Sequence, residues 1–158
     1  MRVNQPLNYR GVSFVLETYG FAPYFELKDE AGQEIFGAFV NLSVLNPGSR
    51  DYFTVPGTNL TVVTGFYPDM VMADGRPSTR SLLPLNPVFS LNVTDEAREL
   101  FVGQLPLGGN VTLEGKSLAF SDLRYWTGYR VVRDPGKDVI FAAFWLGLLG
   151  LLFRYLVT

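Results

Sequence analysis

The feature that most limits how this chain can fold is an uninterrupted apolar run near its C-terminus, Val139 to Val157. The run is 19 residues long and contains one charged residue, Arg154. As an α-helix it would be roughly 28 Å long, about the thickness of the hydrocarbon core of a bilayer. A buried helix of this composition would need a large domain around it, and the preceding residues are mostly short strand-like runs. We therefore predict a transmembrane helix over 137–158, after a separate domain over 1–136.

One side of this predicted helix carries small residues. Ala143, Gly147, Gly150 and Arg154 are spaced i, i+4, i+7 and i+11, so they share one face. Small residues let a neighbouring helix approach closely within lipid. The spacing predicts a helix-packing face, and a chance placement of small residues is the alternative. Arg154 is close enough to the end of the run to reach the headgroups.

The composition excludes several classes of function. The chain has no cysteine and no histidine, so disulfides, thiolate catalysis and the commonest general base, metal ligand and axial haem ligand are absent. The net charge of −2 provides no basic field for nucleic acid. No nucleophile elbow, phosphate-binding loop or dinucleotide fingerprint occurs. We expect no enzyme, no metal site and no nucleic-acid partner.

Residues 1–136 have the pattern of an all-β domain. Short β-branched and aromatic runs alternate with Gly, Pro, Asn and Asp turns, which favours about nine strands in a sandwich or barrel. The clearest predicted strands are 12–19, 24–28, 60–67, 87–93, 111–114, 117–120 and 122–132. One short helix is predicted over 94–101, with Thr94 as its N-cap. The proline-rich segment 68–87 predicts a long irregular surface loop.

Two polar patterns could bind a ligand or a modification. Asp69 and Asp74 could hold a hard cation, but their spacing fits no calcium loop, and a solvated loop is the favoured interpretation. Asn-Xaa-Ser/Thr sequons are glycosylation acceptors only in a eukaryotic secretory setting, and ordinary turn-to-strand chemistry is favoured. The sequons begin at Asn41, Asn59, Asn92 and Asn110.

Arginines and aromatic residues form a third group of candidates. The arginines could pair with an anionic group such as a haem propionate. The favoured interpretation is that they are solvated strand residues near the lipid headgroups. They are Arg10, Arg124, Arg130 and Arg133. The aromatic residues Tyr125, Trp126 and Tyr129 precede the apolar run, and packing is favoured over a haem platform.

Two stretches resemble the ResB-like (ResB/CcsB) family of system II cytochrome c biogenesis. The first is NQPLNYRGVSF at 4–14 with Tyr19, which is similar to the family's opening pattern of Pro-Leu, Tyr, Gly and Phe. The second is YWTGYRVVRDPG at 125–136, followed by an apolar span that contains Gly147 and Gly150. The resemblance covers the C-terminal part of the family, which has further spans upstream of this region. On that basis the chain is expected to be a split, truncated or excerpted member.

The resemblance implies a membrane-anchored scaffold. It places the β domain on the extracytoplasmic side of the inner cell membrane, beside a ResC/CcsA-like partner that helps deliver haem to apocytochrome c. Haem would be handled by the wider complex, because this chain has no histidine to ligate it. Asp134, Pro135 and Gly136 would form the membrane junction. The alternative is a tail-anchored β-sandwich that binds a protein or a glycan and has no link to haem.

Charge alone predicts the opposite orientation. Arg124, Arg130, Arg133 and Lys137 precede the apolar run, whereas only Arg154 lies at its far end. By the positive-inside rule this bias would keep the domain cytoplasmic. The resemblance instead places Arg154 on the cytoplasmic side, and the rule is weak for large folded domains.

Overall fold

A computed structural model describes residues 7–44 and 49–157, so residues 4–6 of the first family-like stretch lie outside it. The described chain is mostly β-strand and ends in one apolar helix, which confirms the predicted fold class. The strands are β1 (Leu7–Tyr9), β2 (Val12–Lys28), β3 (Glu34–Phe39), β4 (Arg50–Thr54), β5 (Leu60–Tyr67), β6 (Met70–Ala73), β7 (Arg76–Thr79), β8 (Val88–Asp95), β9 (Arg98–Pro106), β10 (Asn110–Leu113) and β11 (Lys116–Val132), and the helix is α1 (Gly136–Val157).

The chain divides into two compact units, and two long strands belong to both. One unit is Tyr19–Thr127, and the other joins Met1–Thr18 to Gly128–Thr158. β2 and β11 each pass from one unit to the other. The unit Tyr19–Thr127 is called the sandwich below.

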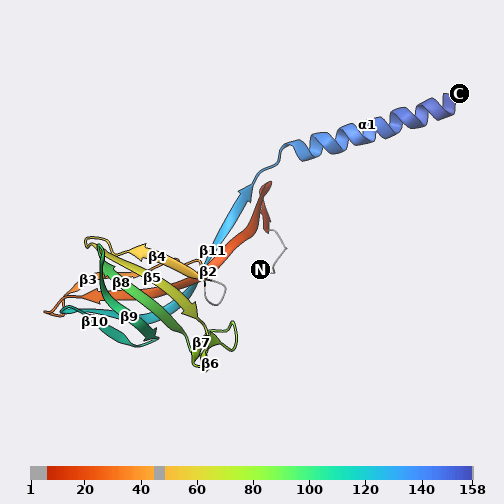
Figure 1. Cartoon of the computed structure of the whole chain (residues 1–158). Coiled ribbons are helices and arrows are strands. Elements are labelled where there is room, and N and C mark those ends of the chain that lie inside the picture. Colours follow the sequence, from red (N-terminus) through yellow and green to blue (C-terminus); the bar gives the residue numbers. More distant parts are fainter. Residues whose placement is uncertain (1–6, 45–48, 158) are drawn as a thin grey trace. The chain divides into compact units, whose positions relative to one another are not determined.

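The sandwich is built from two antiparallel sheets. One sheet has the order β4-β5-β8-β9, and the other contains β3, β2, β11 and β10 (Figure 1). β5 shows why these residues form a half-buried sheet: Leu60, Val62 and Phe66 are buried, whereas Thr61 and Val63 between them are more exposed. This alternation is the period-2 pattern of a strand with one face on the core.

Phenylalanines join the two sheets in the core. Phe66 stacks on Phe89 in the first sheet, with ring centroids 4.5 Å apart. Phe89 meets Phe120 of β11 edge to face at 5.0 Å and Phe25 of β2 at 5.5 Å. All four side chains have 0% exposure. The aromatic cluster therefore connects strands that are up to 95 positions apart in the chain, from Phe25 to Phe120.

The predicted helix over 94–101 is wrong. These residues form a tight hairpin between β8 and β9, in which Glu96 takes a positive φ of 54°. The last residues of β8 also pair with the start of β5, for example Asp95 with Leu60. Backbone pairing on both sides of β8 outweighs the weak local preference for a two-turn helix.

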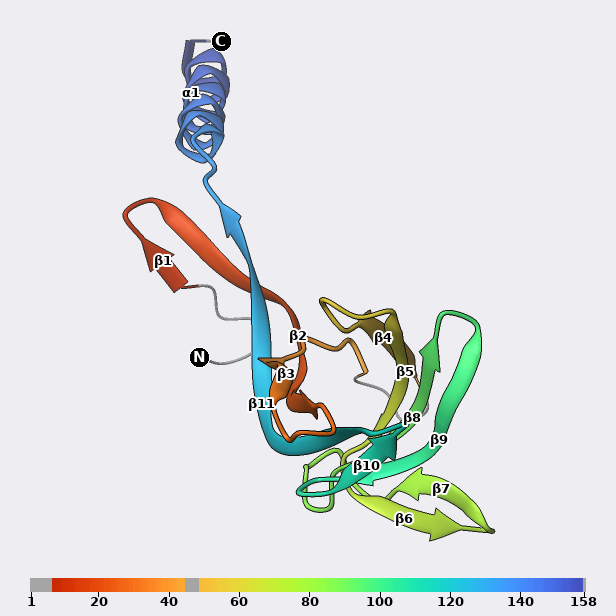
Figure 2. The same cartoon turned by 90° about the vertical axis from the view of Figure 1, so that its left-hand side faces the viewer.

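The segment 68–87 is also more ordered than predicted. It contains the β6–β7 hairpin, which is at the bottom of the view in Figure 2, below the labels of β8 and β9. Its turn is Asp74-Gly75, with φ of 49° and 74°. Two successive positive φ values match a type I′ turn, for which Asp-Gly is a strong sequence signal.

Two predicted strands, 12–19 and 24–28, are one continuous strand, β2. Gly20 does not end a strand. It lies where β2 passes close to other atoms: a methyl group added there would stand 2.4 Å from the backbone oxygen of Leu42 and 2.5 Å from Nε1 of Trp126. The strands predicted over 117–120 and 122–132 are likewise joined in β11.

Candidate functional site

α1 is the one helix in the described residues that is long and apolar enough to cross a membrane, over Gly136–Leu156. None of its apolar window is buried within the protein. The four residues of the predicted packing face, Ala143, Gly147, Gly150 and Arg154, are all exposed. A methyl group added at Gly147 or Gly150 would meet nothing within 4 Å. This face is therefore open to a neighbouring helix, and its packing role stays a prediction.

The three predicted junction residues begin α1. Oδ1 of Asp134 accepts a hydrogen bond from the backbone N–H of Gly136 at 3.0 Å. The Asp134 carboxylate thus accepts from a backbone N–H at the helix start, as a capping side chain does, and Pro135 directly precedes α1. The Asp-Pro-Gly sequence therefore ends the extended chain after β11 and starts the helix within three residues.

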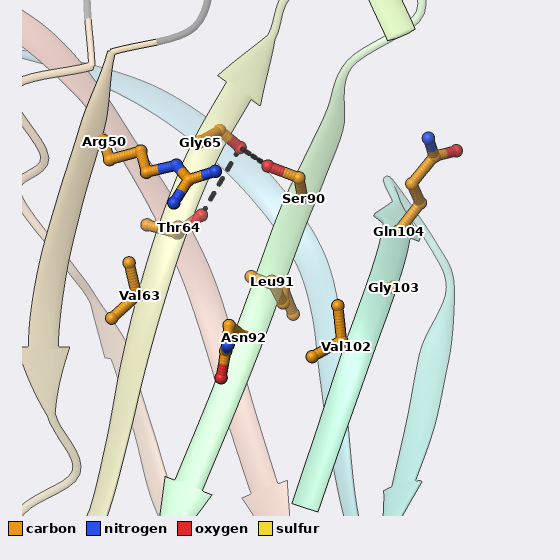
Figure 3. Close-up of a pocket in the computed structure, with 10 residues that line it drawn as sticks. All are labelled: Arg50, Val63, Thr64, Gly65, Ser90, Leu91, Asn92, Val102, Gly103 and Gln104. Atoms are coloured by element: carbon orange, nitrogen blue, oxygen red, sulfur yellow. Dashed lines mark hydrogen bonds between the residues drawn. The ribbon is translucent and has the colours of Figure 1, made fainter. Parts of the chain in front are cut away.

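A shallow pocket lies on the outer face of the β4-β5-β8-β9 sheet, with a volume of about 300 Å³. Antiparallel pairing places Arg50 opposite Gly65, and Gly65 opposite Ser90. Ser90 in turn lies opposite Gln104, so one row crosses all four strands (Figure 3). Because the middle of the row carries no side chain at Gly65 and a small one at Ser90, a depression forms between Arg50 and Gln104.

The pocket offers polar groups that can form hydrogen bonds. In the next row Asn92 lies between Val63 and Val102. Its Nδ2 donates to Oε2 of Glu99 at 3.3 Å, but its Oδ1 is buried and has no partner in the described part of the chain. A buried acceptor without a donor is uncommon in folded proteins. Tyr52, in the same row but outside the lining of the pocket, is 70% exposed and presents an aromatic face next to Val63.

Sequence reasoning missed this pocket because its residues come together only through the register of four strands. The available signal was Gly65, a glycine inside a strong strand pattern, which marks a bulge or open space on the sheet. The predicted candidates Asp69 and Asp74 do not contribute to it, since both lie outside its lining.

Asp69 is buried against an arginine, so the favoured interpretation of a solvated loop is wrong for it. Its side chain is 1% exposed. Arg80 donates from Nε to Oδ2 at 2.9 Å and from Nη2 to Oδ1 at 3.1 Å. These hydrogen bonds, with a smaller charge attraction, hold the pKa of the Asp69 carboxyl below its ordinary value although burial opposes the shift. The ion pair fixes the base of the β6–β7 hairpin.

Replacing Asp69 with asparagine is expected to loosen that hairpin. The amide loses the charge that Arg80 contacts, so trypsin should cleave after Arg80 several-fold faster than in the parent chain. Asp74→Asn, on the exposed turn of the same hairpin, is the control and should cleave at the parental rate. Equal rates for both variants would contradict a structural role for the pair.

The same pair should make stability depend on pH in the acid range. The pKa of Asp69 is lower in the folded chain than in the unfolded chain. Its stabilising contribution is therefore complete above the unfolded pKa and is lost as the pH falls through the folded one, below about pH 4. Asp69→Asn should lose this part of the acid sensitivity in unfolding curves, while Asp74→Asn should retain it.

The candidate arginines Arg124, Arg130 and Arg10 have different neighbours. Arg124 pairs with Asp122 at 3.1 Å and lies 4.4 Å from the ring centre of Phe39. Arg130 forms an ion pair with Glu17, which lowers the pKa of the Glu17 carboxyl mainly through its hydrogen bond. Two of the four arginines thus have an acidic partner already. Arg10 lies 5.2 Å from the ring centre of its neighbour Tyr9.

The two aromatic candidates within the sandwich each contact another residue of it. Nε1 of Trp126 donates to the backbone oxygen of Leu42 at 3.0 Å. The ring of Tyr125 lies 5.1 Å from that of Phe21. Among the sequons, Asn41, Asn59 and Asn110 are exposed, whereas Asn92 lies within β8 at the pocket.

Comparisons with protein-family models, with curated proteins and with solved structures gave no match. The structure thus defines the class of the protein as a β-sandwich with a C-terminal helix able to cross a membrane. Any family assignment depends on the two stretches described above.

Proposed function

We propose that this chain is a membrane-anchored, non-catalytic scaffold in cytochrome c maturation, acting with a ResC/CcsA-like membrane partner. The observation that supports this proposal is that the two family-like stretches fold together. Their described parts up to Thr18 and from Gly128 belong to one unit. Within that unit Glu17, next to the first stretch, forms an ion pair with Arg130 of the second. A shared structural role is a reason for both patterns to occur in one chain.

In this proposal each part of the chain anchors or positions the complex. α1 anchors the chain in the inner cell membrane, and the sandwich stands on the extracytoplasmic side. The face of Ala143, Gly147 and Gly150 packs on a helix of the partner, because small residues allow close approach. Haem is held by the partner and passes to apocytochrome c, so this chain contributes position rather than ligands. Purification in detergent should therefore recover the partner, while this chain alone shows no Soret band.

Enlarging the small-residue face should break the complex. Gly147→Leu with Gly150→Leu adds two bulky side chains where a methyl group now meets nothing, so a close helix contact would be lost. We expect recovery of the ResC-like partner to fall roughly tenfold in detergent co-purification. Leu148→Phe with Leu152→Phe adds bulk on the opposite side of α1 and is the matched control. Unchanged recovery in the glycine variants would refute the packing face.

The pocket favours a second candidate, a glycan-binding module. Shallow sites with several hydrogen-bonding side chains and a nearby aromatic face suit a sugar, and Arg50, Asn92 and Tyr52 supply those groups. One preparation of the protein distinguishes the two candidate functions. A chain that recovers no ResC-like partner but binds a glycan, and loses that binding in Ser90→Val, would support the second candidate and not the first.

A further inference from the structure

The strands that lead to α1 form a ribbon without a covering layer. The ribbon comprises β1, residues 12–18 of β2 and residues 128–132 of β11, all in the unit that contains α1 (Figure 2). None of its side chains is buried. Ribbons of two or three strands are marginally stable in water unless a hydrophobic face is covered. The composition of each face therefore indicates what the ribbon contacts.

Pairing assigns the residues of the ribbon to two faces. Leu7 lies opposite Phe14, and Tyr9 lies opposite Val12, so these four share a face. The Glu17–Arg130 ion pair places those two residues on the other face. Alternation along β2 and β11 then assigns the rest. The first face holds Leu7, Tyr9, Val12, Phe14, Leu16, Thr18, Tyr129 and Val131, and the second holds Asn8, Ser13, Val15, Glu17, Gly128, Arg130 and Val132.

The first face is apolar at every position except Thr18, next to the sandwich, whereas the second carries Asn8, Ser13, Glu17 and Arg130. The apolar face is also open: Leu7 is 55% exposed, Tyr9 59% and Val131 60%. An exposed, contiguous apolar surface of this kind marks an interaction site. The ribbon is therefore amphipathic, with one face prepared for an apolar environment.

The chain itself limits where this environment can be. Three residues lie between Val132, the end of β11, and Gly136, the start of α1. The four steps along the chain from Val132 to Gly136 span at most ~14 Å, so the end of the ribbon stays within that distance of the helix start. If α1 crosses a bilayer, the end of the ribbon next to Val132 therefore lies near its surface in any orientation of the sandwich.

The side chains in and beside the ribbon suit that location. Tyr9 and Tyr129 are aromatic residues with a polar tip, the type enriched at membrane interfaces. Arg10, Arg133 and Lys137 are cationic, and no ion pair is found for any of them among the described residues. Long cationic side chains reach lipid phosphates from a shallow position.

We propose that the apolar face of the ribbon lies in the headgroup–acyl boundary of the membrane that α1 crosses, with the nearby cations on anionic headgroups. Chain continuity with α1 and the unpaired positive charge favour lipid over a partner protein or a second copy of this chain. The proposal requires that α1 crosses a membrane, but it does not require the role in cytochrome c maturation. Its failure would therefore leave that role open, and failure of the partner experiment would leave the lipid contact open.

Site-specific fluorescence on the full chain tests this contact, because the chain has no cysteine of its own. Val131→Cys and Val132→Cys each carry one environment-sensitive label, on neighbouring residues with opposite faces. The chain is reconstituted in phosphatidylcholine–phosphatidylglycerol vesicles that contain lipids with a nitroxide near the headgroup. Interfacial segments enter about 5–10 Å below the surface, so the label at 131 should be blue-shifted and quenched roughly threefold more than the label at 132.

Each other outcome rejects part or all of the proposal. Equal quenching at both positions rejects a lipid-facing apolar face. A blue-shifted label at 131 that nitroxide lipids fail to quench shows that protein covers the face, either a second copy or a co-purified partner. Quenching at 131 that is unchanged in vesicles of phosphatidylcholine alone rejects the contact with anionic headgroups.

Discussion

Replacing Phe89 with alanine is expected to lower the free energy of unfolding of the sandwich by about 3–5 kcal/mol. Phe89 has 0% exposure and contacts phenylalanines of both sheets, with Phe66 at 4.5 Å and Phe120 at 5.0 Å. Truncation removes the burial of a large ring and leaves a cavity that surrounding strands fill only in part. The two aromatic contacts that Phe89 makes across the sheets, with Phe25 and Phe120, are lost together.

Urea unfolding of the full chain in mild detergent measures this effect. The chain has two tryptophans, and a Trp145→Phe background leaves Trp126, in the sandwich, as the reporter. Tyr52→Ala is the control, because Tyr52 is 70% exposed on the outer face and its loss should change stability by about 0.5 kcal/mol or less. A Phe89 variant as stable as the Tyr52 variant would show that the aromatic cluster does not join the sheets.

The sequence predicts well the features that depend on residues close together in the chain. The apolar run of α1 and the Asp134-Pro135-Gly136 junction are local patterns, and the helix begins at Gly136. The alternation in 60–67 likewise coincides with β5. In each case the physical cause, a bilayer-length helix or a strand with one buried face, depends on spacing along a single segment.

The errors arise where pairing with distant residues decides the outcome. Thr94 and Asp95 look like the start of a helix, yet they pair with Thr61 and Leu60 and so extend β8. The pocket at Gly65 and Ser90 needs the register of four strands. To predict the amphipathic ribbon, one must know that the two ends of the domain meet, as Glu17 and Arg130 do. A single sequence states which residues alternate, but not which strands become neighbours.

Gly20 shows the same limit, and its replacement by alanine is expected to destabilise the sandwich by roughly 1–3 kcal/mol. The new methyl group would stand 2.4 Å from the backbone oxygen of Leu42 and 2.5 Å from Nε1 of Trp126. Neither neighbour can move without a cost in free energy. The Leu42 oxygen belongs to the backbone, and Nε1 of Trp126 donates a hydrogen bond to that oxygen at 3.0 Å. The indole must therefore move away from Leu42, and its half-buried donor would lose its acceptor.

Two measurements test this expectation in the Trp145→Phe background. Urea unfolding should show the loss of stability, and the emission of Trp126 should shift as its ring leaves the Leu42 carbonyl. Gly147→Ala is the matched control, because the same methyl group meets nothing within 4 Å in α1 and should leave the sandwich unchanged. Parental stability and emission in Gly20→Ala would mean that β2 and β11 are further apart at this point than the structure places them. A shift in emission without a loss of stability would mean that the indole finds another acceptor, and that Gly20 serves the position of Trp126 rather than the stability of the fold.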